Sequence, residues 1–180
     1  AKLLEDRARA GSTRQVAYIL QMTLTNTTTG RSVWEGEARE RSTPINIGIA
    51  IAIPDGLVAP ALLDCEAKDL ATISTELRDL VARTKIGKLR PAEFTEQTFT
   101  LSNLGSFPVT QFTAIVTPPQ VAILATGRSE ARAVVRDGAV VARTMLTATL
   151  SADHRAVDGA LVAAFLGDLK SRLEAPAGLA

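Results

Sequence analysis

The sequence predicts one α/β (α+β) domain in which short strands outnumber two clear helices. Segments with apolar residues at every second position, or with unbroken β-branched runs, recur along the chain and are typical of strands. Two other segments change to a period near 3.6 residues, which is typical of amphipathic helices. With 46% hydrophobic and 22% charged residues among 180, the composition is that of a globular domain with enough apolar residues for a core.

The pattern before residue 44 differs from the rest of the chain. Apolar and polar residues alternate over 16–25, a turn cluster follows, and residues 32–39 are suited to return as a second strand. A β-hairpin is therefore expected in this part. Thr43-Pro44 marks a break, so we expect residues 1–43 to form an atypical N-terminal segment and residues 44–180 to form the core domain.

The first half of the core domain predicts a strand, a turn and a helix in that order. Ile45–Ile53 is an almost continuous β-branched run, the pattern of a strand buried on both faces. Pro54-Asp55-Gly56 predicts a turn, because proline presets φ and glycine accepts a positive φ, and Leu57–Leu63 is a second apolar run. Residues 68–84 carry apolar side chains at helical spacing, and Gly87 is suited to end that helix.

The second half predicts short strands and one more helix. Strands are expected at 98–102, 114–116, 121–125 and 145–151. A turn at Asn103–Gly105 follows the first of them, and residues 133–141 are expected to hold a tight hairpin turn at Asp137-Gly138. Residues 159–173 place leucine and phenylalanine side chains on one face of a helix.

Charge, cysteine content and hydropathy exclude several classes of protein. The net charge is +1 and the basic residues are scattered, so neither nucleic acid nor a membrane surface is an expected partner. No stretch reaches the roughly 20 apolar residues that span a bilayer, and the charged start Ala1–Ala10 lacks the apolar region of a signal peptide. The single cysteine, Cys65, excludes an internal disulfide and is explained as a small buried hydrophobe. We expect a cytoplasmic protein, or one of the mitochondrial matrix if the source is eukaryotic.

The residues best suited to chemistry lie at one strand-to-helix corner. The run Leu150–Gly159 contains His154, the only histidine, between an apolar strand and the last helix. A neutral imidazole at such a corner is suited to general base catalysis near pH 7. The residues alone leave structural alternatives open: His154 as a structural histidine, Asp158 as the N-cap of the helix, and Arg155 as a surface ion-pair partner.

The run around His154, DHRAVDGALVAAFL at 153–166, resembles the DHRxxDG signature of dihydrolipoamide acyltransferase catalytic domains. These domains form the core component of the 2-oxo acid dehydrogenase complexes. Three more segments resemble that family in the same order: INIGIAIAIPDGLVAPALLD at 45–64, TFTLSNLGSF at 98–107 and FTAIVTPPQVAILATG at 112–127. The resemblance covers residues 44–176, and we find none in residues 1–43.

The resemblance implies a chloramphenicol-acetyltransferase-like two-layer sandwich with a mixed sheet, which we expect to be incomplete or altered on its N-terminal side. It also implies transfer of an acyl group, with acetyl favoured, between dihydrolipoamide and coenzyme A, without a metal. By position, His154 would be the general base, Ser102 the hydroxyl that stabilises the oxyanion, and Asp158 a residue that orients the site. The alternative for Ser102 is a hydroxyl that satisfies the turn at Asn103–Gly105.

The same resemblance implies partners. In this family the histidine of one subunit works with the serine of its neighbour in a homotrimer, and trimers build a hollow cage. The lipoyl group would be carried on another chain or domain, and the other subunits of a complex such as the pyruvate dehydrogenase complex would be partners. One alternative is a non-catalytic assembly or interaction module that retains the acyltransferase fold. Another is an acyltransferase acting on an antibiotic, but such relatives usually carry a second histidine where this chain has Asp153.

Overall fold

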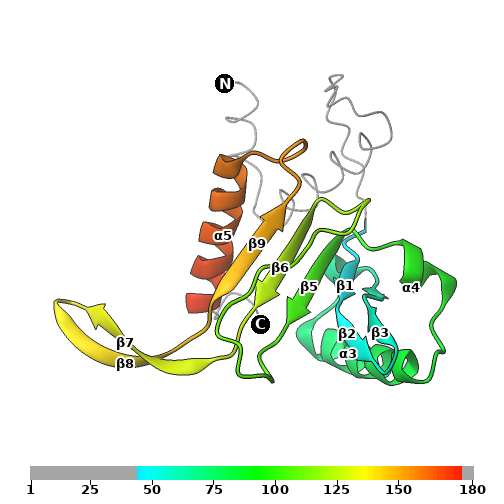
Figure 1. Ribbon diagram of the computed structural model, residues 1–180, viewed down its shortest axis with the longest axis horizontal. Helices are drawn as coiled ribbons and strands as arrows, with labels where there is room; N and C mark the ends of the chain where they lie inside the picture. The colour runs from blue at the N-terminus through cyan, green and yellow to red at the C-terminus, as the bar shows by residue number, and fades with distance from the viewer. Residues whose placement is uncertain (1–43, 176–180) are drawn as a thin grey trace.

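The computed structural model describes residues 44–175, which form a five-stranded mixed sheet with helices and two hairpins around it (Figure 1). The strand order of the main sheet is β4-β1-β5-β6-β9. Its strands are β1 (Ile47–Ile49), β4 (Ala61–Leu62), β5 (Phe99–Asn103), β6 (Ala122–Thr126) and β9 (Ala148–Ala152). The helices are η1 (Cys65–Ala67), α3 (Leu70–Lys85), α4 (Pro91–Thr95) and α5 (Gly159–Glu174). The predicted mixture of strands and helices with a mixed sheet is confirmed.

The run expected as one buried strand at Ile45–Ile53 is two strands, so this prediction is wrong. β1 belongs to the main sheet, whereas β2 (Ile51–Ile53) pairs with β3 (Gly56–Val58) in a separate hairpin. The chain leaves the main sheet at Ala50, whose N–H donates to the carbonyl of Leu101 at 3.0 Å. The predicted turn is confirmed, because Pro54 and Asp55 join the two strands of the hairpin and Gly56 has φ 143°.

The orientation of the strands decides which residues share an end of the sheet. β1, β5 and β6 run parallel to one another, and β9 runs antiparallel to β6. Ser102 of β5 is level with Ala125 near the end of β6, whereas Ala152 at the end of β9 is level with Ala122 at the start of β6. The carboxyl ends of β5 and β9 therefore lie at opposite ends of the sheet.

Helix α5 covers one face of this sheet and forms the core with it. Phe99, Val121, Ala122, Leu124 and Val157 are the buried centre, and apolar residues of α5 from Leu161 to Leu169 pack against them. The rings of Phe99 and Phe165 have centroids 5.9 Å apart. Because side chains alternate along a strand, Thr100 and Ser102 of β5 point to the face opposite α5.

Helix α3 matches the predicted helix and its predicted end. Asp69 caps its first turn by accepting from the Thr72 N–H at 2.7 Å, and Gly87 follows its last turn with φ 68°. α4 was not predicted from the sequence. It is tied to α3 by Glu93, which is 3% exposed and accepts from both terminal nitrogens of Arg83 at 2.7 Å.

A long hairpin, β7 (Glu130–Arg136) and β8 (Ala139–Met145), projects from the body of the domain (Figure 1). The predicted turn is confirmed: Asp137 and Gly138 have φ 50° and 78°. The predicted final strand is also present, but it begins at Ala148, since Met145 belongs to β8.

The strand predicted at 114–116 is wrong. Residues 111–117 are outside every ladder of the described chain, although Ile115 is 89% exposed between two half-buried neighbours. The exposure of these residues alternates as it does in a strand, but Pro118 and Pro119 follow at once and have no N–H to donate to a ladder.

Two expectations concern parts that the structure does not describe. The hairpin expected within 16–39 and the domain boundary after residue 43 lie outside residues 44–175, so both stay predictions. None of the described helices is both long and apolar enough to cross a bilayer.

Candidate active site

His154 lies in the turn that connects the end of β9 to the start of α5. Asp153 continues the sheet, since its N–H donates to the carbonyl of Val121 at 2.8 Å. Val157, on the other side of His154, is buried in the core. His154 itself is exposed, and no residue of the described chain hydrogen-bonds to its imidazole. The predicted strand-to-helix corner is thus present, and it offers the ring to the outside of the domain.

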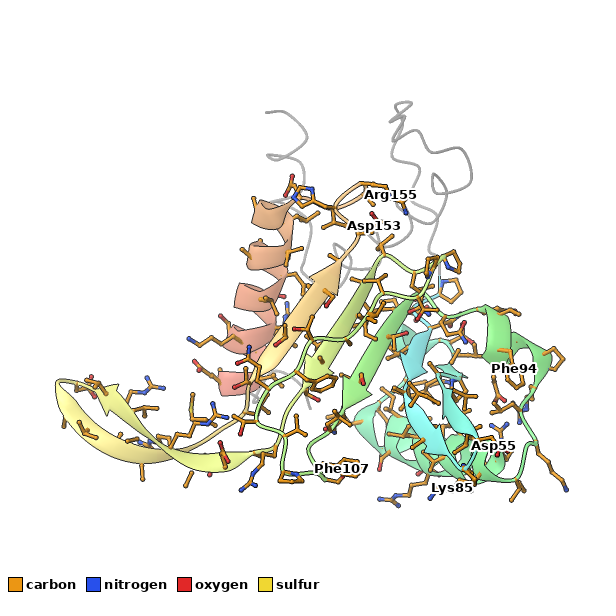
Figure 2. The ribbon with its side chains drawn as sticks, in the orientation of Figure 1. Asp55, Lys85, Phe94, Phe107, Asp153 and Arg155 are labelled. Atoms are coloured by element: carbon orange, nitrogen blue, oxygen red, sulfur yellow. The ribbon has the colours of Figure 1, made fainter. Side chains whose placement is uncertain are left out.

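An ion pair connects the two neighbours of His154 (Figure 2). The Asp153 carboxylate accepts from Arg155 Nε at 3.0 and 3.1 Å and from its terminal nitrogen at 2.6 Å. It also accepts from the backbone N–H of Arg155 at 3.0 Å. The hydrogen bonds from Arg155 hold the pKa of Asp153 below its ordinary value, so Asp153 is a carboxylate at neutral pH. The surface ion pair considered for Arg155 is confirmed, and the spacing of opposite charges on either side of His154 could have identified its partner.

Asp158 is the N-cap of α5. Its side chain accepts from the Leu161 N–H at 2.8 Å, which is the role that its position before the helix predicts. This cap residue, four positions after His154, fixes where the helix begins. No contact between Asp158 and the His154 ring is found among the described residues, so a direct orienting role stays a prediction.

Ser102 lies near the carboxyl end of β5, on the face opposite α5. The turn that follows β5 is held by Asn103, whose Oδ1 accepts from the Gly105 N–H at 2.7 Å. The side chain of Asn103 thus does what the alternative assigned to Ser102. Within residues 44–175 no hydrogen bond engages the Ser102 hydroxyl, which is therefore available to a partner from outside the described chain.

Ser102 and His154 do not meet within one chain. The register places Ser102 two strands away from β9 and four residues along the sheet from Asp153. With strands about 4.8 Å apart and a rise of about 3.3 Å per residue, the Cα atoms of Ser102 and Asp153 are roughly 16 Å apart. His154 is the next residue after Asp153, and a separation of this size is beyond what a serine and a histidine side chain bridge. Figure 2 shows the same separation, with Asp153 and Arg155 at one end of the sheet and Phe107, which follows β5, at the other.

A pocket of about 430 Å³ lies elsewhere, between the C-terminal half of α5 and the sheet. It is lined mainly by apolar side chains, among them Leu124, Leu146, Leu169 and Leu173. Since it opens on the α5 face, neither Ser102 nor His154 lines it. Within residues 44–175, no three histidine, cysteine, aspartate or glutamate side chains gather closely enough to hold a metal ion.

Comparison with known proteins identifies relatives over nearly the whole chain. The profile of the family described as "2-oxoacid dehydrogenases acyltransferase (catalytic domain)" matches residues 2–180. The match includes residues 2–43, so the expectation that the N-terminal segment has no resemblance to the family is wrong.

The curated relatives are longer proteins. The dihydrolipoyllysine-residue acetyltransferase component of the pyruvate dehydrogenase complex from Rickettsia felis is 40% identical over 144 residues, which are 80% of this chain and 35% of that protein. The corresponding component from Rhizobium meliloti is 41% identical over 146 residues, which are 81% and 33%. This chain therefore spans about a third of the length of the curated relatives it matches.

Solved structures confirm the fold. The cubic core of a pyruvate dehydrogenase multienzyme complex superposes with a TM-score of 0.75 at 29% identity, over 96% of this chain and 72% of that one. The dihydrolipoamide acetyltransferase of Azotobacter vinelandii superposes with a TM-score of 0.71 at 34% identity, over 74% and 55%. The latter structure belongs to a crystallographic and enzymatic investigation of a serine, a histidine and an asparagine in that enzyme's catalytic mechanism. There the histidine follows the serine by 52 positions and the asparagine follows the histidine by 4. Ser102, His154 and Asp158 have the same separations.

Proposed function

Because this chain belongs to the family of 2-oxoacid dehydrogenase acyltransferase catalytic domains, we propose that it transfers an acetyl group between dihydrolipoamide and coenzyme A. The observation that carries the proposal is a shared spacing. Ser102, His154 and Asp158 are separated as are the serine, histidine and asparagine studied in the catalytic mechanism of the Azotobacter vinelandii acetyltransferase. The chain has aspartate where that enzyme has asparagine, and both residue types cap helices well.

His154 acts as the general base in this proposal. A thiol has an ordinary pKa of about 8.5, so it is mostly protonated at neutral pH and attacks a thioester slowly. An exposed imidazole within hydrogen-bond reach accepts the thiol proton as the sulfur attacks. In the forward direction the thiol of coenzyme A attacks S-acetyldihydrolipoamide. The new C–S bond forms, the bond to the lipoyl sulfur breaks, and His154 returns its proton to that sulfur.

Ser102 stabilises the charge that develops between these two steps. The tetrahedral intermediate carries an oxyanion, and one well-placed donor to it is worth roughly 3 kcal/mol. The Ser102 hydroxyl is suited to donate because Asn103, and not Ser102, satisfies the turn after β5. No covalent enzyme intermediate is required, since both substrates bring their own sulfur.

The site is formed between two copies of the chain. His154 and Ser102 lie at opposite ends of the same sheet, so one chain does not complete the pair. A cyclic oligomer repeats one contact between unlike surfaces, and it can bring the β9–α5 corner of each copy to the β5 end of the next. We propose a homotrimer, and larger cages built from it. The match to a cubic core supports such an assembly.

The remaining partners follow from the substrate. We propose that a lipoyl group, attached to another domain or chain, brings the acetyl group, and that other subunits of a pyruvate dehydrogenase complex load it. The names of the curated relatives support this assignment. A reducing compartment, the cytoplasm or the mitochondrial matrix, suits thiol substrates of this kind.

The test is a transfer assay combined with a mass measurement. Purified protein is mixed with acetyl-coenzyme A and free dihydrolipoamide, and the release of coenzyme A is followed while light scattering gives the molar mass. Transfer by a trimer or a multiple of trimers is the expected result. An inactive monomer would contradict the proposal and favour the alternative of a non-catalytic assembly module.

A further inference from the structure

We infer that Asp153 and Arg155 are positioning residues for His154, because their ion pair fixes the turn that presents the imidazole. The inference rests on the proposed role of His154 as the catalytic base. It adds that the base depends on its two neighbours for its placement.

The contacts between the two side chains bridge the residues on either side of His154. Both carboxylate oxygens of Asp153 accept from the guanidinium of Arg155, at 2.6 to 3.1 Å, and one of them also accepts from the Arg155 backbone N–H at 3.0 Å. Two parallel hydrogen bonds between a guanidinium and a carboxylate fix orientation as well as distance. The residue before His154 and the residue after it are thus held at a fixed separation.

The backbone on both sides of this pair is anchored to the domain. The Asp153 N–H donates to the carbonyl of Val121 in the sheet, and the Asp153 carbonyl accepts from the N–H groups of Ala156 and Val157 at 3.0 Å each. Val157 is 7% exposed and belongs to the core cluster. His154 is exposed inside this closed turn, and no described residue hydrogen-bonds to its ring. Among the described residues, the position of the His154 ring is therefore set by the backbone of this turn, and the ion pair between Asp153 and Arg155 holds that backbone.

The exposure of the ion pair indicates that it positions His154 and adds little to the stability of the fold. The Arg155 side chain is 74% exposed and that of Asp153 is 18% exposed, and an exposed ion pair contributes little to global stability. Its removal should therefore leave the fold intact and change the geometry at His154. A misplacement of a catalytic group by about 1 Å can lower the rate by about 10²-fold.

The experiment compares Arg155→Met, Arg155→Lys and Asp153→Asn with a matched control. The control is Arg172→Met, which removes another exposed arginine–aspartate pair, with Arg172 Nε 3.0 Å from Asp168 Oδ2 near the other end of α5. Rates are measured with acetyl-coenzyme A and dihydrolipoamide, and unfolding by thermal denaturation. The imidazole is followed by NMR of ¹³Cε1-labelled histidine, which gives one resonance because the sequence has one histidine.

In Arg155→Met and Asp153→Asn, kcat should fall by about 10- to 100-fold, with KM within about two-fold. The kcat of Arg155→Lys should lie between the values of these two variants and that of the wild type, since lysine keeps the charge but lacks the planar guanidinium. The His154 resonance should shift in these variants and stay in place in Arg172→Met, with unfolding midpoints close to the wild type.

Unchanged kcat in Arg155→Met, or an unchanged His154 resonance, would overturn the inference. A loss of rate that only follows a loss of folding would overturn it as well. If the wild type itself transfers no acetyl group, the proposed function fails, and the resonance alone then decides whether the pair orients His154.

Discussion

Two inactive variants of this chain should restore activity to each other when they share an oligomer. His154→Ala lacks the base and Ser102→Ala lacks the oxyanion donor, and each alone should be nearly inactive. The register of β5, β6 and β9 puts the two residues at opposite ends of the sheet, with Ser102 and Asp153 roughly 16 Å apart. A complete pair therefore has to combine the histidine of one copy with the serine of another.

The expected recovery follows from the geometry of a cyclic oligomer. Each contact takes its histidine from one copy and its serine from the next. When the two variants mix at random in equal amounts, half of the copies supply an intact histidine and half an intact serine. About one quarter of all contacts in the mixture should then be complete. In a trimer that contains both variants, one contact of the three is complete, so mixed trimers isolated from the mixture should show about one third of the wild-type rate.

The assay requires co-expression, because subunits that do not exchange form no mixed contacts. The two variants carry different affinity tags, and sequential purification on both tags isolates mixed oligomers before the rate is measured. The matched control replaces Ser102→Ala with the double variant His154→Ala/Ser102→Ala. That mixture contains no intact histidine and should stay inactive. Mixed oligomers of the first kind that show no recovery would refute the shared site.

Four further outcomes follow from the same structure. His154→Ala should lower the transfer rate by about 10²–10⁴-fold with the unfolding midpoint unchanged, and a variant keeping more than half the wild-type rate would rule out the base. Ser102→Ala should lower kcat by roughly 10²-fold with little change in KM, whereas initial rates showing only a rise in KM would assign the hydroxyl to binding. Asp158→Ala should lower the free energy of unfolding by about 1 kcal/mol while Asp158→Asn keeps it; equal losses in urea denaturation would contradict the cap. Glu93→Gln should cost about 2 kcal/mol at pH 7, because hydrogen bonds from Arg83 hold the pKa of Glu93 below its ordinary value of 4.5. A group whose pKa is lowered by folding contributes stability that is complete above its unfolded-state pKa and is lost as the pH falls through its folded-state pKa. The free energies of unfolding of the wild type and Glu93→Gln should therefore converge in acid. A difference that stays constant with pH would contradict the reasoning.

The parts of the fold that the sequence predicts correctly are those governed by neighbours in the chain. Pro54-Asp55 and Asp137-Gly138 form their turns because proline and glycine set the backbone directly. Helix α3 begins after Asp69 and ends before Gly87 for equally local reasons, an acceptor for a free N–H and a residue that accepts positive φ.

The errors concern pairing between distant segments. The β-branched run Ile45–Ile53 predicts extended backbone correctly, but its division at Ala50 depends on a hydrogen bond to Leu101, about fifty residues later. The short apolar run at 114–116 likewise predicts an extended segment without saying whether a neighbouring strand is available. Periodicity reports which side of a segment is apolar and carries no information about its partner.

In the candidate site, too, the features set by neighbours in the chain are predicted and those set by distant segments are not. The corner that holds His154, the cap at Asp158 and the turn at Asn103 are local features, and the sequence predicts each of them. The separation of His154 from Ser102 is not local, because it depends on β9 entering the sheet antiparallel to β6. From the sequence, a site shared between subunits is predicted only through the resemblance to a family. The register of the strands adds a physical reason for that prediction, because it separates the two residues within one chain.

The direction of β9 therefore determines whether the proposed catalytic pair, His154 and Ser102, can form within one chain. If β9 ran parallel to β6, the chain would leave it at the end of the sheet where β5 also ends, and His154 would emerge near Ser102. Because β9 is antiparallel, the chain instead leaves it at the far end, where Asp153 bonds to Val121 ahead of β6. His154, the proposed base, then faces outward on the β9–α5 corner, and no described residue of its own chain hydrogen-bonds to its ring. In the proposed mechanism the base and the oxyanion donor act at the same reacting carbonyl. A base without the donor therefore stabilises the transition state only in part. In the proposed mechanism, catalysis therefore requires a second copy of the chain, and the contact that completes the proposed site is also the contact that builds the proposed oligomer.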